Sequence, residues 1–115
     1  MKIRYCFITL LLCSLAGFAD AQVSRENLIT DIQTLSSIAF AGRKPGTDGH
    51  EKAKDYIIER FTKLGLQPFE PDYTHAFPLN ENLTGHKIIG YIPGKRQETI
   101  VLSAHYDHLG ERQGQ

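Results

Sequence analysis

Two histidines and an aspartate follow an apolar run in the stretch VLSAHYDHLG (residues 101–110). His105 and Asp107 are two positions apart, and in extended backbone such positions project to the same side. A metal-binding imidazole commonly donates its second ring N–H to a carboxylate, which fixes the tautomer and raises ligand basicity. The spacing therefore predicts His105 as a metal ligand and Asp107 as the residue that orients it, with Tyr106 pointing away.

The same residues fit a simpler interpretation, in which His105 is a structural histidine with satisfied hydrogen bonds. Zinc takes about four ligands, and catalytic sites usually take three of them from the protein. His108 is a possible accessory contact, although its direction does not follow from the spacing. The remaining histidines, His50, His75 and His86, stand alone in polar surroundings, and we expect their side chains to be exposed.

An almost continuous apolar run before His105 predicts a strand over residues 99–104 (TIVLSA), covered on both faces. Residues 86–92 (HKIIGYI) predict another strand, and Pro93 and Gly94 indicate a turn between the two, so we expect a hairpin. Prolines limit pairing in the preceding piece, residues 72–79, which we expect to be an edge strand or an irregular segment.

The first helix should begin after Ser24, which is a favourable N-cap, and extend to about Ser37. Its apolar residues recur at helical spacing, at Leu28, Ile32 and Leu35. Residues 41–49 (AGRKPGTDG) are rich in glycine and match no phosphate-binding spacing, so they predict a shaped connection.

The second helix should begin near Thr47 or Asp48, with Asp48 and Glu51 spaced as a capping box. Gly65 stands where a left-handed C-terminal cap is expected. The predicted core-facing stripe consists of Ala53, Tyr56, Ile57, Phe61 and Leu64.

Residues 1–21 have the composition of a signal peptide: a basic start, a short apolar stretch and the small-x-small ending Ala19-Asp20-Ala21. An uncleaved anchor helix is the alternative. Cleavage predicts a secreted or periplasmic chain of residues 22–115 with no stable membrane span. Because Cys6 and Cys13 both lie in the leader, any metal in the mature part must be bound by His, Asp and Glu.

The charge balance argues against a polyanionic partner. Lys and Arg number 13, as do Asp and Glu. Removing the leader takes away more basic than acidic residues, and no basic stripe remains. We therefore expect no nucleic acid or anionic membrane among the partners.

From Leu35 to Gly110 the chain resembles the co-catalytic zinc exopeptidases, metallopeptidase family twenty-eight, which include many secreted bacterial aminopeptidases. The resemblance rests on three stretches in order: AGRKPGTDGHEKAKDYIIERFTKLGLQPF, IIGYIPGK and TIVLSAHYDHLG. The last is the most specific. Lys87 is a departure, because these proteins usually carry Asn before the hydrophobic pair.

The resemblance implies an α/β fold, here the N-terminal part of a mixed-sheet, three-layer zinc exopeptidase fold. It implies a zinc-dependent peptidase acting on peptides through a metal-bound water, with aminopeptidase as the family's commonest activity. His105 would bind one of two zinc ions, and Asp107 would be the carboxylate that supports it.

In that family the bridging Asp, the general-base Glu and the other ligands follow the His-x-Asp segment, so the resemblance implies a general base outside this sequence. We expect residues 22–115 to be an N-terminal fragment, inactive alone. One alternative is a free-standing, inactive module that binds a metal or a partner weakly. Another is a different His-x-Asp metallohydrolase, such as metallopeptidase family twenty.

Overall fold

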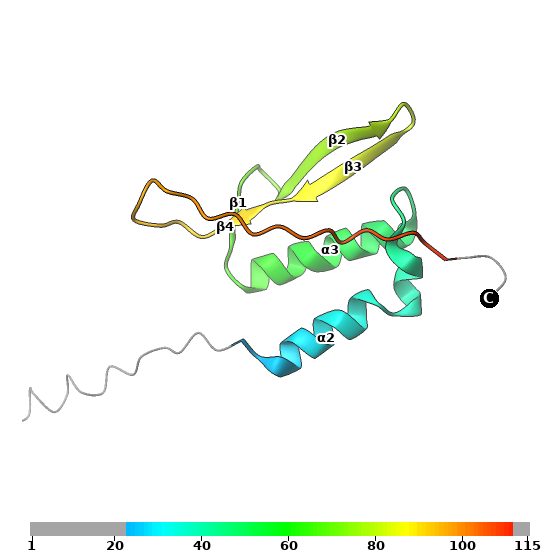
Figure 1. The fold of residues 1–115 in the computed structure, drawn as a ribbon, viewed down its shortest axis with the longest axis horizontal. Helices are drawn as coiled ribbons and strands as arrows, with labels where there is room; N and C mark the ends of the chain where they lie inside the picture. The colour runs from blue at the N-terminus through cyan, green and yellow to red at the C-terminus, as the bar shows by residue number, and fades with distance from the viewer. Residues whose placement is uncertain (1–22, 112–115) are drawn as a thin grey trace, which may run out of the picture.

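The computed structural model describes residues 23–111 of the 115-residue chain. Helices and small antiparallel sheets occur together, as a general α/β class requires (Figure 1). The elements are α2 (Arg25–Leu35), the 3-10 helix η1 (Ile38–Arg43), α3 (Asp48–Lys63), β1 (Gln67–Pro68), β2 (Thr74–Asn80), β3 (Leu83–Ile88) and β4 (Gly90–Tyr91). The predicted signal peptide, residues 1–21, lies outside the described residues. No helix within residues 23–111 has the length and apolar character needed to cross a bilayer.

Helix α2 begins as the sequence predicts. The Ser24 side chain accepts a hydrogen bond from the backbone N–H of Asn27, which satisfies one of the free donors of the first turn. Polar contacts join the helix to α3. The Asp31 carboxylate accepts a hydrogen bond from the Tyr56 hydroxyl at 2.5 Å, and it lies 2.8 Å from Nε of Arg60. The hydroxyl bond of Tyr56 and the charge and hydrogen bond of Arg60 lower the pKa of Asp31 and outweigh its partial burial.

We expect Asp31→Asn to lower the free energy of unfolding by about 1 kcal/mol at neutral pH, because a charge-assisted interaction between the helices is lost. A carboxylate whose pKa is depressed by folding stabilises the fold above its unfolded pKa of about 3.9, and this contribution disappears as the pH falls. Urea unfolding at pH 7 and below pH 4 measures both effects.

Glu59→Gln is the matched control for this prediction, since Glu59 pairs with Lys63 on the exposed side of α3. It should change stability little, because exposed pairs contribute little. An Asp31→Asn penalty that is equally large in acid would contradict the ionic account.

Helix α3 begins at Asp48 and ends before Gly65, both as predicted, but the predicted capping box does not form. Thr47 is the N-cap, and its hydroxyl accepts the backbone N–H of His50. Glu51 instead pairs with Lys54, so the capping box of Asp48 and Glu51 is wrong. At the other end, Gly65 has φ +73°. The N–H groups of Gly65 and Leu66 bond back to Thr62 and Phe61, as a Schellman cap requires.

The strands pair differently from the predicted hairpin. β2 pairs antiparallel with β3, from Thr74 opposite Ile88 to Asn80 opposite Leu83, with an irregularity between Pro78 and Asn80. β2 is thus the edge strand predicted for this region. β4 pairs antiparallel with β1 instead of with residues 99–104. The tight turn after β2 favours the local partner, because a short loop is the cheapest to close.

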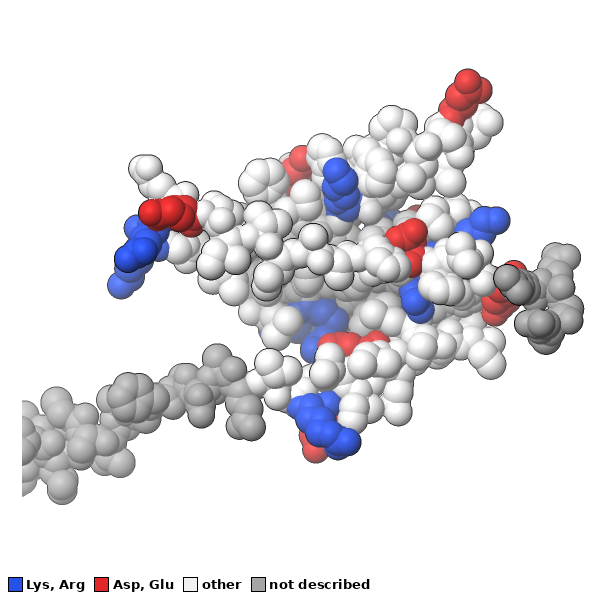
Figure 2. Space-filling view, viewed as in Figure 1, with Lys and Arg blue, Asp and Glu red and all other residues white. Residues whose placement is uncertain are grey.

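Residues 99–104 form no strand in the structure, so the predicted buried strand is wrong for the described residues. Figure 1 shows this part of the chain running along α3 without a paired neighbour. Its apolar side chains are almost fully exposed, at 90% for Ile100, 78% for Val101 and 93% for Leu102. In Figure 2 the same path is a continuous uncharged band. The sequence is suited to burial, but nothing in residues 23–111 covers it.

The packed interior of the described residues is small and lies around the first half of α3. Ala53 is the one fully buried apolar residue there, and no large side chain is buried completely. Close backbone approach does much of the packing instead. A Cβ atom placed on Gly49 would lie 2.6 Å from the carbonyl carbon of Phe40, so η1 rests directly on the start of α3.

Candidate functional site

The segment that carries the predicted site residues is held against η1 by backbone hydrogen bonds. The N–H of Gly110 donates to the carbonyl of Gly42 at 3.0 Å, and the N–H of His108 donates to the carbonyl of Arg43 at 3.1 Å. Gly42 has φ +62°, and a Cβ there would lie 2.5 Å from Gly110. The glycine-rich connection is therefore shaped to receive this segment at close range.

His105 and Asp107 lie on the same side of the backbone, as their spacing predicts. Nδ1 of His105 is 3.0 Å from the backbone carbonyl oxygen of Asp107 and 3.5 Å from its carboxylate Oδ1. A carbonyl oxygen only accepts hydrogen bonds, so Nδ1 must carry the proton. In neutral imidazole this leaves the lone pair on Nε2. The His105 side chain is 82% exposed, so Nε2 is open to solvent.

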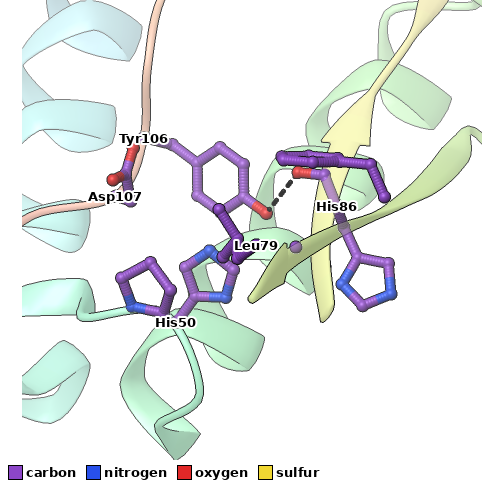
Figure 3. Close-up of a pocket in the computed structure, with 8 residues that line it drawn as sticks. His50, Leu79, His86, Tyr106 and Asp107 are labelled. Carbon is purple, nitrogen blue, oxygen red and sulfur yellow. Dashed lines mark hydrogen bonds between the residues drawn. The ribbon is translucent and has the colours of Figure 1, made fainter. Parts of the chain in front are cut away.

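Tyr106 points to the opposite side, into a small pocket between α3 and the β2–β3 hairpin (Figure 3). Its ring stacks on His50 with centroids 4.8 Å apart and planes at 22°, and its hydroxyl donates to the carbonyl of His86 at 3.1 Å. Burial raises the pKa of Tyr106 to about 12, and the nearby carboxylates of Glu51 and Asp107 act in the same direction.

The pocket has a volume of about 100 Å³, enough for a few water molecules. Its walls are formed by Pro45, His50, Phe77, Leu79, Gly85, His86, Tyr106 and Asp107. Half of these residues are apolar, and the rings of His50 and Tyr106 stack on each other. Tyr106 occupies this pocket, on the side of the segment opposite to the exposed side chain of His105.

His50 contradicts the prediction that it is an exposed histidine, since only 4% of it is accessible. It lies one helical turn before Ala53 and two before Ile57, so it belongs to the stripe of α3 that faces the hairpin. The helical spacing of positions 50, 53 and 57 is visible in the sequence, and it could have predicted that His50 is buried. Its Nδ1 is buried without a hydrogen-bond partner, as is Nδ1 of His86. His86 is only partly exposed, so the prediction that it is an exposed histidine is also wrong.

The other two histidines differ in their surroundings. His75 is exposed as predicted, and its Nδ1 lies 2.7 Å from Oε1 of Glu70. His108 is exposed and is held through its backbone N–H to Arg43. In residues 23–111, no group of three or more His, Cys, Asp and Glu side chains is placed to hold a metal ion together.

The chemistry available at this place is therefore that of one oriented imidazole. His105 offers a solvent-facing Nε2 while its other nitrogen is held by Asp107, which is the arrangement of a metal-binding histidine. Further ligands would have to come from groups other than those placed around it in residues 23–111. Neither a known protein-family profile nor a solved structure matches the chain significantly.

Proposed function

We propose that the chain is part of a secreted zinc-dependent peptidase of the co-catalytic exopeptidase type, with His105 as a ligand to one of two zinc ions. The observation that supports this proposal most directly is the orientation of His105. Its Nδ1 donates to the backbone carbonyl oxygen of Asp107, and its Nε2 faces solvent. The family resemblance supplies the rest, including the three-layer fold, the peptide substrate and aminopeptidase as the commonest activity.

The donor set fits zinc as one corner of a site. Neutral imidazole nitrogen is a preferred zinc ligand, and a carboxylate close to the opposite ring nitrogen raises its basicity. Asp107 stands in that position, with Oδ1 3.5 Å from Nδ1. Zinc bound there would supply Lewis acidity, which polarises a carbonyl and makes water a better nucleophile. His105 would hold the ion, and Asp107 would keep the ring in the tautomer that binds it.

Zinc titration of the full chain tests the metal site. The ring nitrogen signals of His105, followed by NMR, should show zinc binding at Nε2. Asp107→Asn keeps the backbone hydrogen bond to Nδ1 but removes the carboxylate charge beside it, and it should weaken zinc binding about tenfold. His75 is an internal control, because it is also exposed and also has a carboxylate at Nδ1. Equal zinc affinity at His75 and His105, or an unchanged affinity in Asp107→Asn, would remove the support for a dedicated site.

The coding sequence after the codon for Gln115 separates a peptidase from a free-standing metal-binding module. An in-frame continuation with Asp-Asp and Glu-Glu segments supports the peptidase. Its product should hydrolyse aminoacyl nitroanilides with zinc, and Asp107→Asn should reduce that activity 10- to 100-fold. The 115-residue chain should show no such hydrolysis, so turnover that depends on His105 in this chain would contradict the proposal as stated.

A further inference from the structure

Arg43 is attached to both peptide groups that flank Asp107. Its Nε donates to the carbonyl oxygen of Tyr106 at 2.8 Å, and its own carbonyl accepts the N–H of His108 at 3.1 Å. Its Nη1 donates to the carbonyl of Leu35, the last residue of α2. That carbonyl is one of the groups a helix end leaves free, and a cation is favourable there. One guanidinium therefore links the end of α2 to the segment that carries Asp107.

The orientation of His105 depends on the peptide of Asp107. With 82% of its side chain exposed, His105 has little packing to hold its ring. The hydrogen bond from Nδ1 goes to the backbone carbonyl of Asp107, not to its carboxylate. A rotation of the Asp107 peptide would therefore release the ring, and Arg43 contacts restrain the chain on both sides of that residue.

We infer that Arg43 is a positioning residue for the metal-binding histidine. It fixes the Asp107 backbone, which in turn holds the Nδ1–H tautomer of His105 and leaves Nε2 free. The consequence for zinc rests on the proposed function, whereas the effect on the tautomer does not.

Arg43→Lys tests the guanidinium. An ammonium retains the charge but lacks the rigid fork that reaches Tyr106 and Leu35 together. At about pH 8.5 the ring ¹⁵N shifts of His105 in the full chain should report Nδ1–H in the wild type. In Arg43→Lys they should move to a mixture of tautomers, and the zinc affinity of His105 should fall about tenfold.

Arg43→Gly separates the side chain from the backbone. Arg43 has φ +49°, a conformation that glycine adopts freely, so the loop and its carbonyl bond to His108 should persist while the guanidinium is lost. We expect the same loss of tautomer preference as in Arg43→Lys. This variant keeps the test decisive if the lysine variant folds poorly.

Arg60→Lys is the control for loss of an arginine that joins two helices, because Arg60 contacts Asp31 and lies outside the site. It should lower stability and leave the His105 ring signals unchanged. The inference is overturned if both Arg43 variants keep the wild-type tautomer, or if Arg60→Lys changes it equally. Absence of zinc binding at His105 in the wild type would instead remove the support for a dedicated metal site, and the tautomer measurement would still decide the role of Arg43.

Discussion

Gly49→Ala is expected to destabilise the fold by about 3 kcal/mol or more, although the same change in an unobstructed helix stabilises by roughly 0.5–1 kcal/mol. A Cβ at position 49 would lie 2.6 Å from the carbonyl carbon of Phe40, overlap its oxygen, and approach Cβ of Ala41 at 3.2 Å. The main obstacle is backbone, which cannot rotate aside as a side chain can. The methyl group must therefore push η1 away from α3.

The displacement should reach the candidate site, because η1 carries Gly42 and Arg43, on which residues 108–110 are seated. Urea unfolding followed by circular dichroism gives the stability change, and the Tyr106 and His105 NMR signals report the site. Gly94→Ala is the control: its nearest atom is 4.0 Å away, so its effect should stay within about 0.5 kcal/mol. Wild-type stability in Gly49→Ala would mean that η1 does not pack on α3 this closely.

The parts of the fold that the sequence predicted correctly are governed by local rules. The Ser24 cap and the Gly65 cap each depend on residues within one helical turn. The His105–Asp107 pair is also local, since alternation along extended backbone places both side chains together. These features need no knowledge of what lies elsewhere in the chain.

The features that the sequence did not predict depend on partners distant in the chain. Arg43 and Tyr106 are 63 positions apart, and no periodicity connects them. The apolar pattern of residues 99–104 predicts that their side chains are buried, but it does not identify the segment that packs on them. The predicted hairpin with residues 86–92 was wrong for this reason. Residues 83–88, which include the start of that region, pair with β2 instead.

Tyr106→Ala is expected to lower the free energy of unfolding by about 2–3 kcal/mol, below the range for fully buried aromatic residues because Tyr106 is only partly buried. The change removes the ring stacked on His50 and the bond to the His86 carbonyl, and it enlarges a pocket that already holds some space. Tyr106→Phe removes only the hydroxyl and should lower stability by about 1 kcal/mol. Urea unfolding at pH 7 should therefore rank wild type, phenylalanine and alanine in that order.

Alkaline pH gives an independent test of the Tyr106 environment. Its pKa is raised from 10.0 to about 12 in the folded chain. Above pH 10 the unfolded chain releases a proton that the folded chain retains, so stability should fall as the pH rises towards 12. Tyr106→Phe should remove this part of the fall and leave the part that comes from other groups. An identical loss of stability at alkaline pH in wild type and Tyr106→Phe would show that the Tyr106 ring is not desolvated against His50. The segment that carries His105 would then not be held by Tyr106 in the pocket.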